Sequence, residues 1–334
     1  MSDNNKDLLQ ILSYGGIGDR LCDIIGSYII SKYLGLKLNV LFNPVIGIKH
    51  AWGNTDIFDI RLFDFNNENI KIFNNQNDYK NDYKNDCKYI IKIGNASSSS
   101  SPYNIYKFIK NFKKDISFEE IINIYCSYAR EIIKPSKIIE NNIPDNLNNS
   151  YGIHLRKTDK VNNKNHDMRH LSTNEEFKIM SNALFNDICI IILSEDNPSF
   201  LLTSDENGWK EYFKNELLTF AKNNNKTISF IDVNYDTYDT YDNYNAILDL
   251  FCLSKCKKIF QDVKYSTFST IAAIIGNNEL INYSYLLEDH KYCLIHLYHP
   301  IININNNKNY NIDYINEVLT ACEPIYSNID IKSF

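Results

Sequence analysis

The strongest constraint on the fold is an alternation of short apolar segments and helical patterns that runs through the chain twice. The first run predicts strands at 9–13, 37–42 and 89–93, and helices at 19–34, 103–112 and 118–133. The second run predicts strands at 151–155, 188–193, 228–232, 257–261 and 279–283, and helices at 173–184, 208–222, 243–255 and 266–276. Such alternation is typical of parallel sheets joined by crossover helices, so we predict an α/β fold with two sheets.

A stretch rich in Asn and Pro separates the two runs. It begins near Pro135 and continues through residues 141–150, and such punctuation marks a domain boundary. With 334 residues, the chain is long enough for two domains that each bury a core. We predict a first domain at 1–148, a second at 149–305, and a C-terminal helix and tail at 306–334. Two such units predict a ligand cleft that faces the carboxyl ends of the strands.

The formal net charge of −6 argues against a dedicated nucleic-acid binder, because such proteins neutralise phosphates with Lys and Arg. The N-terminal residues are polar and do not resemble a secretory leader. The longest apolar run, 188–193, is too short for a membrane span. We therefore expect a cytoplasmic protein whose eight cysteines are reduced. Cys252 and Cys256 lie four residues apart without a second pair at suitable spacing, which favours core thiols over a metal site.

A glycine-rich turn joins the first predicted strand to the first predicted helix. Gly16 and Gly18 would let the backbone approach a phosphate at the helix N-terminus. The third glycine of a dinucleotide fingerprint is missing, because Leu21 stands at that position. A phosphate loop and a tight structural turn are both consistent with this segment.

The predicted strand 151–155 leads directly into a charged segment that contains Arg156, Lys157 and Lys160. Side chains alternate along a strand, so His154 and Arg156 share one face at its carboxyl end. The planar guanidinium of an arginine can form paired hydrogen bonds with a pyrophosphate. Because open α/β sheets bind ligands at this edge, the segment favours a ligand site over a merely charged loop.

Three weaker signals follow in the second half. Asp196 lies directly after the predicted strand 188–193, where a catalytic acid and a helix cap are both possible. Asp249 is a single acid in a mostly apolar helix; it either reads the donors of a guanine edge or lies on the exposed face. Ser269 and Thr270 open the helix after strand 257–261, as phosphate ligands or as a cap.

Together these segments resemble one enzyme family. Residues 152–161 (Gly-Ile-His-Leu-Arg-Lys-Thr-Asp-Lys-Val) are similar to the H-x-R-R-T-D-K motif of GDP-fucose-dependent fucosyltransferases. The closest likeness is to α-1,6-fucosyltransferases and bacterial nodulation-factor fucosyltransferases. Four further segments resemble the family's G-x-G-D-x-L, A-T-D-D-P-S, L-D-I-x-x-L-S and T-F-S-S motifs, in that order: 16–21, 193–199, 248–254 and 267–270.

The resemblance implies a GT-B glycosyltransferase, with two Rossmann-like domains, a cleft between them and the acceptor domain first. It implies an inverting, metal-independent transfer of fucose from GDP-fucose to a glycan hydroxyl, with no further cofactor. It also implies a role for each matching residue. Arg156 would bind the β-phosphate, His154 would lie beside the nucleotide, Asp249 would read guanine, Ser269 and Thr270 would contact the pyrophosphate, and Lys160 would lie near the reacting centre.

The sequence departs from the family at the general base. The family's catalytic Glu lies four residues after the motif's Lys, and Lys164 stands there in this chain. A base is therefore expected in the 162–170 loop, at His166 or Asp167, or at Glu195 or Asp196. The departure keeps two alternatives open, which are another GDP-sugar as donor and a catalytically silent module that binds a glycan or nucleotide.

Overall fold

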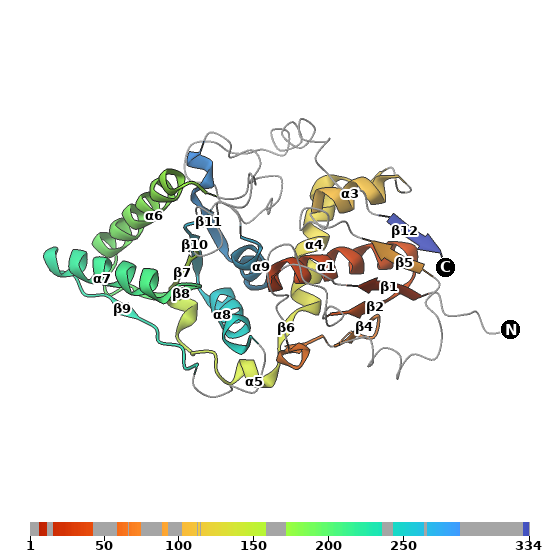
Figure 1. The fold of residues 1–334 in the computed structure, drawn as a ribbon, viewed down its shortest axis with the longest axis horizontal. Coiled ribbons are helices and arrows are strands. Elements are labelled where there is room, and N and C mark those ends of the chain that lie inside the picture. The colour runs from red at the N-terminus through yellow and green to blue at the C-terminus, as the bar shows by residue number, and fades with distance from the viewer. Residues whose placement is uncertain are drawn as a thin grey trace. The chain divides into compact units, whose positions relative to one another are not determined.

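A computed structural model describes residues 7–11, 16–42, 59–65, 67–74, 89–92, 102–111, 113, 115–157, 172–235, 243–263, 266–287 and 330–333 (Figure 1). Contacts divide the chain into two compact units. The first comprises 1–141, 235–248 and 321–334, and the second comprises 142–234 and 249–320. The chain therefore returns to the first unit twice after leaving it, which the linear domain prediction of 1–148, 149–305 and 306–334 did not include.

The first unit contains a five-stranded sheet in the order β12-β5-β1-β2-β4. The strands are β1 (Asp7–Ile11), β2 (Lys37–Leu41), β4 (Ile70–Phe73), β5 (Tyr89–Lys92) and β12 (Asp330–Ser333). The four earlier strands pair in parallel, whereas β12 pairs antiparallel with β5. Their order, in which the first strand lies beside the fourth, is that of a Rossmann half-sheet. The predicted C-terminal helix and tail thus contains a strand, which covers the edge that β5 would otherwise expose.

Helix α1 (Ile17–Leu34) lies in the core of the first unit, and its side chains are buried around almost the whole helix. It ends at Gly35, whose φ of +65° is left-handed and favours glycine. Helix α1 packs against α3 and α4. The remaining elements of this unit are α3 (Pro102–Lys110), α4 (Phe118–Ile132), α5 (Lys137–Glu140), the 3-10 turn η1 (Ile60–Leu62), and the paired strands β3 (Phe63–Asp64) and β6 (Lys134–Pro135).

The second unit contains a five-stranded, all-parallel sheet in the order β11-β10-β7-β8-β9. Numbered along the chain, this is the Rossmann order 3-2-1-4-5 read from the other side. The strands are β7 (Tyr151–Leu155), β8 (Ser199–Ser204), β9 (Ser229–Phe230), β10 (Lys258–Gln261) and β11 (Glu279–Asn282). The helices and turns are α6 (Asn174–Ser194), α7 (Asn207–Asn223), α9 (Thr267–Gly276), η3 (Leu147–Asn149) and η4 (Tyr283–Leu286). Helix α8 (Tyr244–Lys255) belongs to the second unit from Asp249 onward, and its earlier residues belong to the first.

Helices cover both faces of this second sheet (Figure 1). Ile153 and Leu155 of β7 pack in one cluster with apolar residues of α6 and α7. The alternate residues of β7 face the other pair of helices, because His154 contacts α9 and Gly152 lies against α8. A Cβ atom on Gly152 would lie 2.8 Å from Leu253, so the glycine allows close packing of strand and helix.

The predicted strand at 188–193 is wrong, because these residues form the last turns of α6. Thr173 and Glu176 form a capping box that starts the helix. One side of the helix then packs into the core through residues at helical spacing, which are Met180, Leu184 and Ile188. The strand in this part of the chain is instead β8, which follows the turn 195–198.

The predicted α/β class with two Rossmann-like sheets is confirmed, since each unit has its own parallel sheet in a Rossmann order. Within the described ranges, α6 is long and apolar enough to cross a membrane by length and composition alone, and one side of it packs into the core of the second unit. Cys252 and Cys256 are fully buried, and burial raises the pKa of the Cys256 thiol to about 12. Both therefore are core thiols.

Candidate functional site

The candidate site lies at the carboxyl edge of the second sheet, where the strand order reverses between β7 and β10. Doubly wound sheets bind ligands at this switch point, because the two crossover connections there leave in opposite directions. The chain leaves β7 after Leu155 and leaves β10 after Gln261, and α9 begins at Thr267. Strand pairing places His154 directly beside Gln261. Polar residues from three elements therefore meet at one place within the second unit.

His154 is held by a chain of side-chain hydrogen bonds. Gln261 Nε2 donates to the Val263 carbonyl at 3.2 Å, so its Oε1 accepts the hydroxyl hydrogen of Ser269. His154 Nδ1 lies 3.1 Å from Ser269 Oγ and, because that hydroxyl is already donating, must itself donate. The imidazole ring also contacts the ring of Phe268 at 5.1 Å between centroids. His154 is therefore fixed in one orientation, with Nδ1 directed at Ser269.

Two carboxylates hold the chain where it leaves β7. The Arg156 backbone N–H donates to Asp262 Oδ1 at 2.9 Å, and the next N–H, that of Lys157, donates to Asp205 Oδ1 at 3.0 Å. Asp205 Oδ2 also lies 3.8 Å from Arg156 Nε, in a partly exposed ion pair. Asp262 follows β10 and Asp205 follows β8, so one carboxylate comes from each strand beside β7. We call Asp205 and Asp262 the carboxylate pair.

Asp262 is the buried member of the carboxylate pair, with 0% of its surface exposed. Its second oxygen, Oδ2, accepts the indole N–H of Trp209 at 3.0 Å. Burial, helped by the nearby Asp205 charge, raises the pKa of the Asp262 carboxyl from 3.8 to about 7, against the lowering effect of its two N–H donors. Trp209 lies on α7 and also has the Lys157 ammonium 5.2 Å from its ring centroid.

The N-terminus of α9 borders the same site. Its cap residue is Ser266, which is 1% exposed and whose hydroxyl has no hydrogen-bond partner among the described residues. The Thr270 hydroxyl donates to the Ser266 carbonyl at 2.9 Å, and Ser269 is occupied by His154 and Gln261. The unpaired N–H groups of a helix N-terminus attract anions. An anion could therefore bind here, with Ser266 as the hydroxyl closest to the helix start.

The other predicted residues lie on other elements of the chain. Asp249 lies half-buried in the middle of α8, one turn before Cys252. Asp196 is exposed and precedes β8, so it lies at the amino edge of the sheet, opposite to His154 and Arg156. Asp196 was expected at the carboxyl edge because residues 188–193 were predicted to be a strand, and they are helical. Lys160, His166 and Asp167 lie outside the described residues.

Gly16 and Gly18 belong to the first unit. Gly16 caps α1 with an ordinary extended φ of −68°, and a Cβ atom there would meet nothing described within 4 Å. Gly18 is buried in the first turn of α1. Neither the backbone conformation at Gly16 nor the described atoms around it therefore require a glycine.

Sequence reasoning missed Asp205, Trp209 and Asp262. Asp205 follows an apolar strand at the carboxyl edge, which is the signal that we had assigned to Asp196. If the strand had been predicted at 199–204, Asp205 would have been recognised as the acid that follows it. Asp262 directly follows the correctly predicted strand near 257–261, but a single acid after a strand is a weak signal. Trp209 carries no signal of its own, because its role depends on a contact between α7 and β10.

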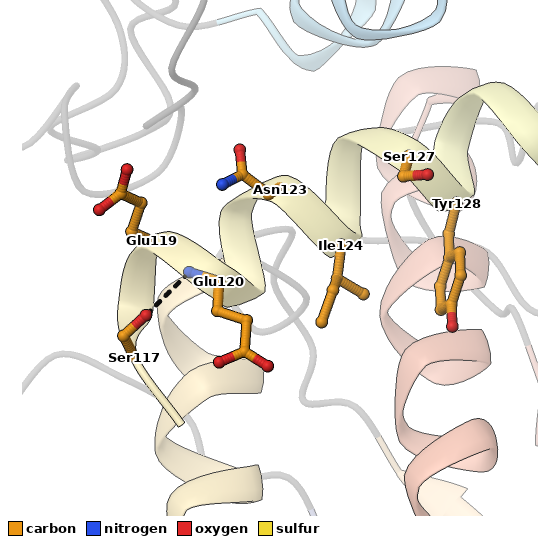
Figure 2. Close-up of a pocket in the computed structure, with 7 residues that line it drawn as sticks. All are labelled: Ser117, Glu119, Glu120, Asn123, Ile124, Ser127 and Tyr128. Atoms are coloured by element: carbon orange, nitrogen blue, oxygen red, sulfur yellow. Dashed lines mark hydrogen bonds between the residues drawn. The ribbon is translucent and has the colours of Figure 1, made fainter. Parts of the chain in front are cut away.

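A hollow lies on the first unit, along the exposed side of α4 (Figure 2). It has a volume of about 490 Å³, and its lining residues all come from α4 and its cap: Ser117, Glu119, Glu120, Asn123, Ile124, Ser127 and Tyr128. Ser117 accepts the Glu120 N–H at 3.1 Å and caps the helix, as Figure 2 shows. None of the residues predicted from the sequence lines this hollow.

No protein-family model and no curated protein matches the chain. Several solved structures are similar in fold. An Arabidopsis thaliana FUT1 mutant in complex with GDP has a TM-score of 0.48 and 12% identity, over 83% of this chain and 70% of that one. The NodZ α-1,6-fucosyltransferase, known from Bradyrhizobium and soaked with GDP-fucose, has a TM-score of 0.47 and 11% identity, over 81% and 93%. POFUT1 in complex with GDP-fucose has a TM-score of 0.48 and 12% identity, over 83% and 95%.

Proposed function

We propose that the chain is a glycosyltransferase that uses a GDP-sugar, with fucose as the sugar that the sequence resemblance favours. The observation that carries this proposal is the placement of Arg156 and His154 at the switch point, beside the N-terminus of α9. A guanidinium and a helix N-terminus are both suited to the phosphates of a nucleotide diphosphate. The fixed imidazole of His154 supplies an oriented polar group beside them.

The proposed reaction breaks the bond between the sugar C1 and the phosphate oxygen while an acceptor hydroxyl attacks C1 from the opposite face. The configuration at C1 is thereby inverted. Negative charge develops on the departing GDP, and the guanidinium of Arg156 and the ammonium of Lys160 would stabilise it. These cations take the place that a divalent metal has in other transferases. The chain contains no Asp-x-Asp sequence, which agrees with transfer that proceeds without a metal.

The acceptor hydroxyl must lose its proton during the attack, and a positioned base contributes about 10²–10⁴-fold. His166 and Asp167 are the proposed candidates, because Glu195 and Asp196 both precede β8, at the far edge of the sheet. Alanine substitution of each, assayed with saturating donor, identifies the base by a loss of this size. If both variants retain turnover within about tenfold of the wild type, neither is the base.

Nucleotide binding tests the proposal most directly. Isothermal titration should show GDP binding at least tenfold more tightly than UDP, because Asp249 would accept two donors of the guanine edge. Asp249→Asn should then weaken GDP binding by roughly ten- to a hundredfold. Equal binding of GDP and UDP by the wild type would contradict the proposal. Transfer from GDP-fucose should persist in EDTA.

A catalytically silent binding module is the second candidate, and Lys164 in place of the family's Glu favours it. The two candidates agree on GDP binding but differ in turnover. Release of GDP from GDP-fucose, followed with and without glycan acceptors, separates them. A module binds the donor without releasing GDP. A panel of other GDP-sugars in the same assay identifies the donor sugar.

A further inference from the structure

We propose that Asp262 is a positioning residue, which acts on the ligand through Arg156 and sets the direction in which that arginine leaves β7. The inference rests on the proposed function, because it assumes that Arg156 binds the donor's phosphates. Asp262 itself contacts no ligand in this scheme, since it is fully buried and both of its oxygens accept N–H donors from the protein.

Arg156 lies immediately after the last residue of β7. Strand pairing ends with Leu155, so Arg156 is the first residue whose backbone β8 and β10 do not hold through the sheet. An arginine at such a point could leave the sheet in several directions. The 2.9 Å bond from its backbone N–H to Asp262 Oδ1 restricts this freedom at Arg156 itself, and Asp205 holds the N–H of the next residue, Lys157. The guanidinium is left partly exposed, with 28% of the side chain accessible.

Asp262 is in turn fixed to a second element. The indole N–H of Trp209 donates to its other oxygen, and Trp209 packs against Phe177 and Phe213 in the apolar layer between α6 and α7. The Asp262 carboxylate therefore connects the end of β7 to α7, which covers the face of the sheet opposite to α9. A carboxylate suits this place better than an amide, because each of its two oxygens can accept a hydrogen bond and neither must donate one.

A buried carboxylate is costly for the fold, and this one lies beside a proposed anion site, where its charge opposes the ligand. A residue kept only for stability would be better replaced by an apolar side chain of similar size. The positioning of Arg156 gives the carboxylate a role that outweighs both costs.

The test is a double-mutant cycle on GDP affinity, measured by calorimetry with wild type, Asp262→Asn, Arg156→Ala and the double variant. Asn keeps the size of the side chain but turns one acceptor into a donor that faces either Arg156 or Trp209. We expect Asp262→Asn to weaken GDP binding by roughly ten- to a hundredfold. Within the Arg156→Ala background, the same change should alter affinity less than about twofold, because the group through which Asp262 acts is gone. Equal losses in both backgrounds would overturn the proposal.

Two further variants separate positioning from general damage. Glu279→Gln removes a carboxylate paired with Lys258 at 3.0 Å, at the amino edge of the same sheet, and should leave GDP affinity unchanged. Trp209→Phe removes one donor to Asp262 but leaves the bond to Arg156, so it should weaken GDP binding less than Asp262→Asn does. If Asp262→Asn does not fold, Trp209→Phe decides, and unchanged affinity in that variant counts against the proposal.

Amide hydrogen exchange tests the same inference without a ligand. Asp262→Asn should speed exchange of the Arg156 amide at least tenfold, whereas Glu279→Gln should not. Failure of the wild type to bind any nucleotide would therefore contradict the proposed function, and with it the effect of Asp262 on the ligand, but not the restraint of Asp262 on the Arg156 backbone. If the Arg156 amide exchanges at the same rate in Asp262→Asn as in the wild type, the positioning role is contradicted and the proposed function is unaffected.

Discussion

Arg156 and Asp262 illustrate how the site depends on single atoms of neighbouring residues. The side chain of Arg156 carries the charge, whereas its backbone N–H carries the restraint that gives the charge a direction. Substitutions of the two residues therefore have different consequences for affinity, fold and pH dependence, and they can be examined separately.

Arg156→Lys keeps the positive charge but loses the planar fork of donors. We expect it to weaken GDP binding by about tenfold, and Arg156→Ala to abolish transfer while the protein stays folded. Titration calorimetry and circular dichroism measure the two effects. If lysine fully restores the affinity lost in the alanine variant, the site recognises charge alone and not the geometry of a guanidinium.

The pKa of Asp262 makes a prediction about stability. Because the folded-state pKa of about 7 lies above the ordinary value of 3.8, the folded protein binds more protons than the unfolded chain between these values. The contribution of Asp262 to the free energy of unfolding should therefore fall as pH rises from about 4 to about 7, by an amount on the order of a few kcal/mol, and then level off.

Asp262→Asn removes this titration, so its stability should change less with pH over the same range. Urea unfolding at four or five pH values measures both proteins. The free energy of unfolding of the variant, relative to that of the wild type, should increase as pH rises towards 7. Parallel pH profiles for the two proteins would mean that the carboxyl does not titrate in this range.

At the scale of elements, α6 and β8 show where sequence patterns are reliable and where they are not. The run Ile-Cys-Ile-Ile-Ile-Leu at 188–193 has the composition of a buried strand, because β-branched residues are enriched in strands. It is helical here because the capping box at Thr173 starts a helix and nothing stops it before residue 195. Because the strand was predicted at 188–193 and not at 199–204, the acid expected at the end of a strand was Asp196 and not Asp205.

The last residue of α9, Gly276, lies against the backbone near the end of α8 at Ser254. A Cβ atom at that position would lie 2.0 Å from the Ser254 carbonyl oxygen, so backbone would have to move. We expect Gly276→Ala to destabilise the protein by about 1–3 kcal/mol or more. Chemical denaturation gives this value directly.

Gly208→Ala is the matched control for that substitution. Its Cβ atom would meet only Glu206 Oε1, at 3.6 Å, which is an ordinary contact. It should be neutral or slightly stabilising, because alanine favours a helix more than glycine does. A loss of stability at Gly208 as large as that at Gly276 would show that close packing is not the cause.

At the scale of the whole molecule, the alternation of strands and helices predicted two Rossmann-like sheets, since period and turn residues are local properties. The pairing of distant segments could not be predicted in this way. Residues 330–333 carry no pattern that distinguishes them from a tail, and only the open edge of β5 makes them a strand. The carboxylate pair was hidden for the same reason, because the two acids and the backbone that they bind follow three separate strands, β8, β10 and β7.

Deletion of residues 330–334 should destabilise the first unit by exposing the edge of β5, while the proposed nucleotide site in the second unit persists. We expect a melting temperature several degrees lower and GDP affinity within about threefold of the wild type. Deletion of Phe334 alone, which leaves β12 in place, is the control. A large loss of GDP binding on removal of β12 would show that the units do not fold independently.

The same edge strand has a consequence for how the protein is made. The four parallel strands of the first sheet leave the ribosome early, but β12 is synthesised only after the whole of the second unit. For most of translation, β5 therefore offers an unpaired row of N–H and C=O groups, which is a ready template for another chain. Nascent chains that stall before residue 330 should bind chaperones or one another through this edge, and the completed chain should not.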